Sequence, residues 1–194
     1  MCKPINQTHQ RILDRAESLF LIQGYSLVRL RDIADELGMK QAALYYYAPD
    51  GKEDLFIQVI ERSMSRHRAG METAIQEVSG DIGAQMRAVA AWLLSQPPVN
   101  VSRLGESDFL AIDPAKAAQL SHLIFDALRL PLTGALEQAK QHGIVELDNC
   151  GLAAITFVSV IEMIHADTSP FIVHSKETII DQLIEMFLKG WLKR

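Results

Sequence analysis

Cysteine is scarce in this sequence of 194 residues, and long apolar runs are missing. Cys2 and Cys150 lie far apart and neither belongs to a CxxC pair, which excludes a disulfide framework and a zinc knuckle. No stretch reaches the ~18 uninterrupted apolar residues of a membrane-spanning helix, because the best candidate, residues 152–164, contains Glu162. The first residues also lack the apolar core of a signal peptide. We therefore expect a cytoplasmic protein without a membrane partner.

Motifs of catalysis are absent too. The sequence contains no GxSxG, P-loop or GxGxxG pattern, and its six histidines show no HxxxH or HExxH spacing. Glu162 and His165, with Asp167 nearby, resemble half of a di-iron Glu-x-x-His site, but a second such motif is missing. We expect no enzyme activity, no metal site and no cofactor.

Helical periodicity runs through most of the chain and predicts an all-α fold. Gly70 is expected to bend the fourth helix, Pro131 to kink or split the sixth, and residues 99–112 to form a loop with at most one helical turn. A short strand is expected at residues 171–173. The predicted helices span residues 8–23, 30–37, 41–47, 52–78, 81–95, 113–142, 149–165 and 175–194.

The stretch from Arg29 to Lys52 predicts a helix-turn-helix. Leu30, Ile33, Ala34 and Leu37 form one apolar face of a short helix, and Gly38 can adopt the left-handed conformation that ends many helices. A second short helix follows, anchored by Leu44 and stopped by Pro49-Asp50-Gly51. In such a motif the second helix enters the DNA major groove. The alternative is a solvent-exposed helical hairpin whose tyrosines pack against neighbours.

The composition of this stretch favours double-stranded DNA as a partner. Gln can pair with adenine and Ala can touch a thymine methyl, so we expect Gln41, Ala42 and Ala43 near base edges. Cationic and hydroxyl groups suit phosphate oxygens, which gives the expected phosphate contacts Arg29, Arg31, Tyr45, Tyr47 and Lys52. The net charge of −5 argues against a protein that coats nucleic acid. Up to Arg68, however, ten basic residues face nine acidic ones, so the acidic excess lies outside this region.

Over roughly residues 9–56 the sequence resembles the TetR family of bacterial transcriptional regulators. The matching segments are Leu19-Phe20, Gly24-Tyr25, Leu30-Arg31-Asp32-Ile33-Ala34, Leu37-Gly38, Leu44-Tyr45-Tyr46-Tyr47 and Lys52-Glu53-Asp54-Leu55. Three departures stand out. Val28-Arg29 replaces the usual Thr or Ser cap, Ala48 replaces a Phe, and Gly51 is one extra residue before Lys52.

The resemblance implies a three-helix head (residues 1–52) joined by a long helix to a larger ligand-binding and dimerisation domain (residues 53–194). It implies an effector pocket, for which the candidate contacts are Met86, Trp92, Arg103, Phe109, His122 and Phe125. It also implies a homodimer through the last two helices, with the candidate residues Ile155, Ser159, Glu162, Ile180, Ile184, Phe187 and Trp191. For each of these residues, ordinary core packing is the alternative.

The expected function is therefore a ligand-responsive regulator of transcription. As a homodimer it would bind a palindromic operator, most simply as a repressor, and an unknown small molecule would release it. The alternative is a helical small-molecule carrier or protein-interaction module that does not bind DNA. The motif between Arg29 and Lys52 separates the two, because a carrier has no need for paired tyrosines on a short exposed helix beside basic residues.

Overall fold

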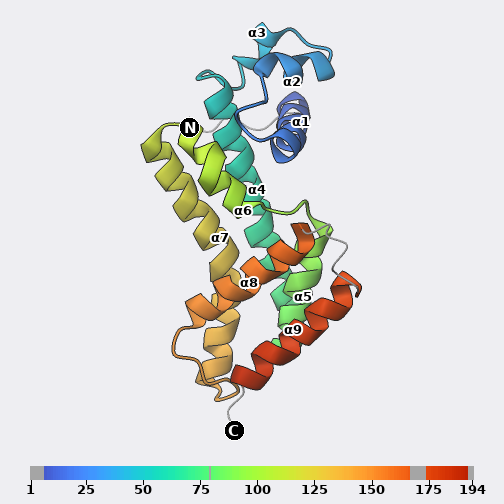
Figure 1. The fold of residues 1–194 in the computed structure, drawn as a ribbon, viewed down its shortest axis with the longest axis vertical. Coiled ribbons are helices and arrows are strands. Elements are labelled where there is room, and N and C mark those ends of the chain that lie inside the picture. Colours follow the sequence, from blue (N-terminus) through green and yellow to red (C-terminus); the bar gives the residue numbers. More distant parts are fainter. Residues whose placement is uncertain (1–6, 79, 167–173, 192–194) are drawn as a thin grey trace. The chain divides into compact units, whose positions relative to one another are not determined.

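The predicted helical pattern is found in the computed structural model of the chain, which describes residues 7–78, 80–166 and 174–191. Within these ranges the chain forms helices and connecting turns, and no strand is found among the described residues. The all-α prediction is confirmed, whereas the strand expected at residues 171–173 lies outside the described part. In chain order (Figure 1), the elements are α1 (Gln7–Gln23), α2 (Leu30–Glu36), α3 (Gln41–Leu44), α4 (Lys52–Glu77), α5 (Ile82–Ser95), α6 (Val101–Arg103), η1 (Leu104–Asp108), η2 (Phe109–Ala111), α7 (Pro114–Gln141), α8 (Cys150–Ala166) and α9 (Lys176–Trp191).

The chain divides into two compact units. Of the described residues, the first unit holds those up to Ser63 together with Val101–Leu123, and the second holds Met64–Asn100 and the residues from Ile124 onward. Both α4 and α7 contribute residues to both units. The division predicted after residue 52 is a functional one and stays a prediction.

Aromatic rings form the centre of the first unit. Phe20 of α1 meets Phe56 of α4 edge to face, with ring centroids 5.2 Å apart, and Tyr25 lies 4.9 Å from Phe56. All three are buried because the apolar stripes of α1 and α4 face each other here. This core holds α1 and the first turns of α4 together and so supports the two short helices between them.

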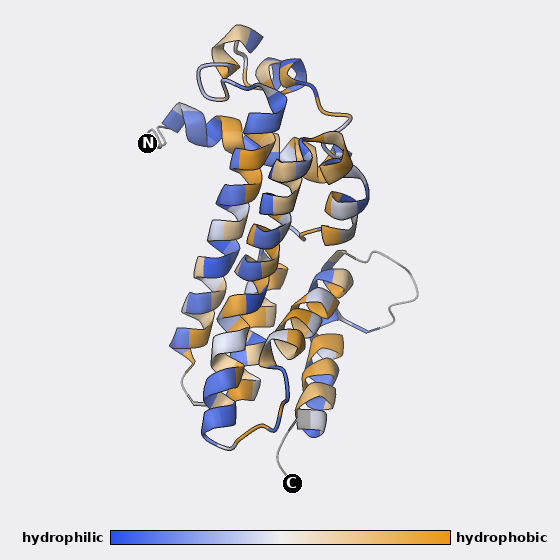
Figure 2. Cartoon of the chain, turned by 90° about the vertical axis from the view of Figure 1, so that its left-hand side faces the viewer, coloured by the Kyte–Doolittle hydropathy of each residue, from blue (hydrophilic) through white to orange (hydrophobic). Residues whose placement is uncertain are grey.

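The second unit is built on the apolar faces of α5, α8 and α9. Met86, Leu93 and Ile184 are fully buried, and Phe157 of α8 meets Phe187 of α9 edge to face at 5.7 Å. Figure 2 shows hydrophobic and hydrophilic residues interleaved along the long helices, the pattern of helices that bury one side. The helices of this unit therefore share one apolar core.

One local prediction was wrong. Residues 99–112 show little periodicity, yet the chain there forms three successive helical turns: α6, the π-turn η1 and the 3-10 turn η2. Pro131 lies inside α7, which continues through it, so Pro131 does not split that helix, and a kink there stays a prediction. The expected helix ends elsewhere agree with the structure within a few residues, except that α3 stops at Leu44.

Candidate nucleic-acid interface

The first helix of the motif, α2, begins without the usual hydroxyl cap. Arg29 precedes it in an extended conformation, and the Arg29 backbone N–H donates to the Asp32 carboxylate at 3.0 Å. Asp32 is in the first turn, where a carboxylate also interacts favourably with the positive end of the helix. Leu30, Ile33 and Ala34 are buried, as their spacing predicts. The acidic side chain thus compensates for the missing Thr or Ser.

A tight turn at Gly38 separates α2 from α3. Gly38 has a φ of +65°, and its N–H donates to the Asp35 carbonyl at 3.1 Å, while the Met39 N–H donates to the Ala34 carbonyl at 3.0 Å. This pair of bonds closes the end of α2 and requires the left-handed conformation that glycine adopts without strain. Only two residues, Met39 and Lys40, separate Gly38 from Gln41, where α3 begins.

Helix α3 buries one residue and exposes the others. Leu44 has no exposed surface, whereas Gln41, Ala42 and Ala43 are all exposed. Tyr45 and Tyr46, in the turn that follows, are 47% and 61% exposed. One apolar anchor therefore holds a short helix whose small and amide side chains point away from the core.

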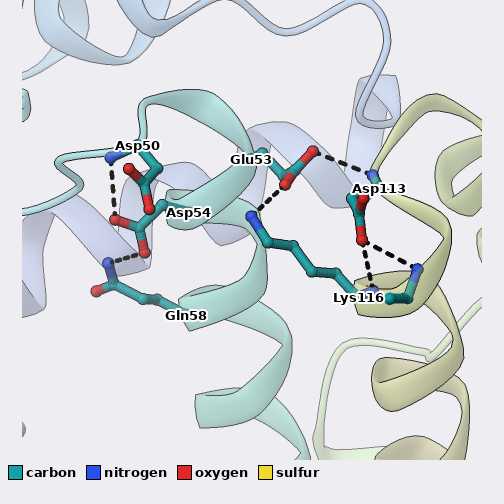
Figure 3. Close-up of polar contacts among 7 residues, drawn as sticks. Asp50, Glu53, Asp54, Gln58, Asp113 and Lys116 are labelled. Carbon is teal, nitrogen blue, oxygen red and sulfur yellow. Dashed lines mark hydrogen bonds and ion pairs between the residues drawn. The ribbon is translucent and has the colours of Figure 1, made fainter.

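Tyr47 lies at the base of this helix and packs against α1. Its ring centroid is 5.3 Å from that of His9, and its carbonyl accepts a hydrogen bond from Gln58 Nε2 at 3.0 Å. The same nitrogen donates to Asp54 Oδ1 at 2.9 Å, a bond visible in Figure 3, and Gln58 Oε1 lies 2.8 Å from His9 Nε2. These bonds tie the end of α3 to α1 and α4. Tyr47 was predicted as a phosphate contact; its packing makes it a positioning residue, and contact with a phosphate stays a prediction.

Lys52 is likewise engaged within the head. Its ammonium donates to the Tyr25 carbonyl at 3.0 Å and lies 4.0 Å from the centroid of the Tyr25 ring. Burial lowers the pKa of Lys52 from its ordinary value. Lys52 therefore joins the first turn of α4 to the turn after α1, and a direct phosphate contact by this side chain stays a prediction.

Three exposed cations lie close to α3 in the sequence. Arg29 and Arg31 flank the start of α2, and the Nε of Arg31 pairs with Asp35 at 3.4 Å while the side chain stays 77% exposed. Lys40, directly before α3, is also exposed. Reasoning from the sequence missed Lys40, although its place in the turn before the second helix was the available signal.

Arg103 was predicted to contact a ligand, but its guanidinium binds the end of α1. Its two terminal nitrogens donate to the carbonyls of Leu21 (2.6 Å) and Phe20 (2.9 Å), and its Nε lies 3.4 Å from Asp108 Oδ2. The buried Asp108 carboxylate in turn accepts the Tyr25 N–H at 2.9 Å. The Arg103–Asp108 pair therefore holds the turn after α1, where Gly24 has a φ of +79° and leaves room for Asp108.

The start of α7 is fastened to the start of α4 inside the same unit (Figure 3). Glu53 accepts the Lys116 ammonium at 2.5 Å and the Asp113 backbone N–H at 3.2 Å. The hydrogen bond from Lys116 is the main cause that lowers the pKa of Glu53, and the same bond raises the pKa of Lys116. Residues 101–123 are thus connected to the end of α1 through Arg103 and Asp108, and to the start of α4 through Lys116 and Asp113.

The other predicted ligand contacts are distributed over both units. Phe109 and His122 belong to the first unit, and His122 is exposed. Met86, Trp92 and Phe125 belong to the second unit, where Met86 is fully buried and Phe125 is 47% exposed. A shared pocket for these residues stays a prediction.

The predicted interface residues differ in exposure. Ser159 is exposed and Ile155 partly so, whereas Glu162, Ile180 and Ile184 are buried within the second unit. Phe187 packs on Phe157. The side chain of Trp191 lies outside the described part of the chain. A dimer interface on α8 and α9 stays a prediction.

Among the described residues, no group of three or more His, Cys, Asp or Glu side chains is placed to hold a metal ion. None of the helices in the described ranges is both long and apolar enough to cross a membrane.

A short exposed helix, α3, follows a glycine turn and is supported by the helices around it. This arrangement defines the class of helix-turn-helix proteins. Residues 12–59 match the family model of bacterial regulatory proteins of the tetR family. This segment of the chain is therefore similar to the regulators of the TetR family.

Two curated relatives from Bacillus subtilis (strain 168) match a part of the chain. The uncharacterised HTH-type transcriptional regulator YxaF is 38% identical and the HTH-type transcriptional regulator LmrA 40% identical, each over 53 residues. The match covers 27% of this chain and only 28% of either relative, so the similarity to them is limited to that part.

Solved structures match the fold over nearly the whole chain. The fatty acid degradation regulator FadR from Bacillus halodurans superposes with a TM-score of 0.77 at 16% identity, covering 97% of this chain and 98% of that one. A TetR transcriptional regulator from Legionella pneumophila gives 0.75 at 22% identity, covering 95% and 98%. A putative transcriptional regulator from Saccharomonospora viridis, in complex with choline, gives 0.73 at 19% identity, covering 97% and 99%. At these identities the likeness concerns the fold.

Proposed function

We propose that the chain is a ligand-responsive, DNA-binding transcriptional regulator that acts in the cytoplasm. As a homodimer it binds a palindromic operator, represses transcription there, and is released by a small-molecule effector. The proposal rests on the burial pattern of α3, which buries Leu44 and exposes Gln41, Ala42 and Ala43. Small and amide side chains on an outward helix suit base edges in a major groove.

The head supplies two kinds of DNA contact in this proposal. Gln41, Ala42 and Ala43 read base edges, and exposed groups around them bind phosphates. The phosphate contacts are Arg29, Arg31, Lys40 and Tyr45. Lys52 and Tyr47 position the head through their bonds to Tyr25, His9 and Gln58.

The operator requires two heads, which supports a homodimer. A palindromic site places its half-sites about one helical turn or a multiple apart, and a two-fold dimer matches that symmetry. On α8 the exposed side chains Leu152, Ser159 and Met163 share one helix face, since they are spaced by seven and four residues. Leu152 and Met163 are 62% and 64% exposed, so this face presents two large apolar side chains that the described residues do not cover. We assign this face, with Ile155, to the interface.

The effector belongs to the part of the chain after the head, which we propose is residues 53–194. Its binding must favour the conformation that does not fit the operator, because a ligand with equal affinity for both states shifts nothing. The regulator from Saccharomonospora viridis holds choline on a similar fold, which supports a small-molecule role for this part. Residues 101–123 contact the head through Arg103 and Asp108, and so offer it a second attachment besides α4.

The test is binding of the purified protein to fluorescent duplexes from its own upstream region, across a salt series. We expect a preferred site and an affinity that falls steeply with salt, by about 0.9 in log K per log unit of salt for each phosphate contacted. Lys40→Ala should weaken all duplexes alike and reduce this slope by about one contact. Gln41→Ala should instead change the preference between sites, because it removes a base-edge contact.

A site preference that is the same with and without Gln41 would contradict the assignment of α3. Absence of binding to any duplex at low salt, also after unfolding and refolding to remove a bound ligand, would overturn the proposed function. The helical carrier would then be the better account of the chain.

A further inference from the structure

A carboxylate is buried in the second unit without a cation. Glu162 of α8 is 5% exposed, and its Oε2 accepts the Val99 backbone N–H at 2.6 Å. The other oxygen, Oε1, is enclosed and has no hydrogen-bond partner among the described residues. Burial raises the pKa of Glu162 to about 7, and the hydrogen bond from the Val99 N–H opposes this rise. Among the described residues, no cation forms an ion pair with the Glu162 carboxylate.

Such an arrangement is costly in an isolated protein. A buried carboxylate is stabilised by a cation or by several hydrogen bonds, and otherwise it takes up a proton. Glu162 has one hydrogen bond and lies on the same buried helix side as Phe157, Val158 and Ile161, each without exposed surface. A glutamine at this position could accept the same Val99 N–H without burying a negative charge, so the carboxylate points to a partner that the described residues do not supply.

Two further polar atoms of the second unit are enclosed without a hydrogen-bond partner among the described residues. His165 follows Glu162 by three residues on α8, so the two side chains share a helix face. The Nε2 of His165 lies 2.7 Å from the Gln96 carbonyl, which requires the proton on Nε2 and leaves Nδ1 as an acceptor. Within the described residues, Nδ1 of His165 and Nε1 of Trp92 are both enclosed and unbonded.

The backbone brings these groups together at one end of α5. Gln96 and Val99, which bind His165 and Glu162, directly follow α5, and Trp92 is one turn before Gln96. The Trp92 ring also lies against Gly70 of α4, where an added Cβ would come within 2.1 Å of it. The end of α5 and the residues after it therefore contact α4 through Trp92 and α8 through Gln96 and Val99. Helix α8 carries the two unbonded acceptors, Oε1 and Nδ1, and α5 carries the unbonded indole N–H.

We propose that Glu162 is the charge-recognising group of a small-molecule site in the second unit, and that its ligand is an organic amine bound as the ammonium ion. The ammonium N–H groups donate to Glu162 Oε1 and His165 Nδ1, and the apolar body of the ligand packs against apolar side chains of the second unit. This inference rests on the proposed effector-responsive function and names the chemical class of the effector. Two acceptors on one helix face match a cation with at least two N–H donors.

Three probes of equal chain length test the proposal: octylammonium, octan-1-ol and octyltrimethylammonium. Binding to the whole protein is measured by calorimetry at pH 8. We expect octylammonium to bind on the order of tenfold more tightly than octan-1-ol, because a charge-assisted hydrogen bond is added. Octyltrimethylammonium lacks N–H donors and should lose most of this advantage.

Two variants separate a specific site from general binding of an amphiphile. Glu162→Gln keeps an acceptor for the Val99 N–H and should abolish the preference for the ammonium over the alcohol. Glu137→Gln changes an exposed carboxylate on α7 and should leave that preference unaltered. If Glu162→Gln does not fold, the unaltered protein still provides the test. Its affinity for octylammonium should then increase from pH 6 to pH 8 more than its affinity for octyltrimethylammonium.

Equal binding of octylammonium and octan-1-ol would overturn the inference, and so would an ammonium preference that survives in Glu162→Gln. DNA binding of the unaltered protein is measured on the same preparation. Specific DNA binding without an ammonium preference overturns the ligand class alone and leaves the proposed regulator standing. If the unaltered protein prefers the ammonium but does not bind DNA specifically, the proposed regulator is overturned and the amine site stands.

Discussion

At the scale of the residue, some of the side chains that hold the head in place are cations, the same type of group that binds DNA phosphates. Lys52 and Arg103 both donate to backbone carbonyls at the end of α1 or in the turn after it. Both cations already hold the turn after α1, so the count of basic residues alone does not measure the surface open to phosphates, and a phosphate contact by Lys52 stays a prediction. Arg29, Arg31 and Lys40 are the exposed cations close to α3.

Glu162 gives the first prediction at this scale, a dependence of stability on pH. Burial raises its pKa to about 7 from an ordinary value of 4.5, so between these values the folded state binds more protons than the unfolded state. The free energy of unfolding should therefore fall as the pH rises through this window, by roughly 3 kcal/mol in total. Glu162→Gln removes this dependence.

Urea unfolding at pH 5 and at pH 8 measures the effect. Relative to the unaltered protein, Glu162→Gln should gain much more stability at pH 8 than at pH 5. Glu137→Gln serves as the matched control, since Glu137 is exposed on α7. An equal stability difference between Glu162→Gln and the unaltered protein at both pH values would contradict the buried, unpaired carboxylate.

At the scale of the element, α4 contains a glycine that its packing requires. A Cβ at Gly70 would lie 2.1 Å from Trp92 Cε2, so the indole ring takes the space of a side chain. Alanine normally favours a helix by about 1 kcal/mol over glycine. Here the overlap outweighs that gain, and Gly70→Ala should lower the free energy of unfolding by about 1–3 kcal/mol.

Gly134→Ala in α7 is the matched control. Gly134 is exposed in a helix, and no atom lies within 4 Å of an added Cβ. This variant should gain up to about 1 kcal/mol from helix propensity alone. Thermal and urea unfolding of both variants decide the matter, and a stabilised Gly70→Ala would show that the Trp92 ring can move aside without cost.

Elements with a local signal were predictable from the sequence, and elements shaped by distant contacts were not. The ends of α1 and the turn at Gly38 follow from apolar spacing and from glycine chemistry. Residues 101–111 have no such periodicity, because their turns are fixed by bonds from Arg103 and Asp108 to residues more than eighty positions away. The same holds in the site: exposure of Gln41 follows from the pattern around Leu44, whereas the bond from Lys52 to the Tyr25 carbonyl has no signature in sequence.

At the scale of the whole molecule, the proposed regulator depends on a second copy of the chain. One head contacts a single half-site, and two linked heads gain affinity because the second binds at a high effective concentration.

Met163 is 64% exposed on the α8 face assigned to the interface. If Met163 were replaced by lysine, dimer formation would bury the lysine ammonium in an apolar interface, which is costly, while the core of the monomer would stay unchanged. Met163→Lys should therefore give a monomer mass in sedimentation at micromolar concentration and bind the full palindrome no better than a single half-site. Leu110→Lys, at a leucine that is 80% exposed on η2, is the control and should keep the dimer mass. A monomer mass for the unaltered protein would contradict the proposed homodimer, whereas a dimer that persists in Met163→Lys would move the interface away from this face of α8.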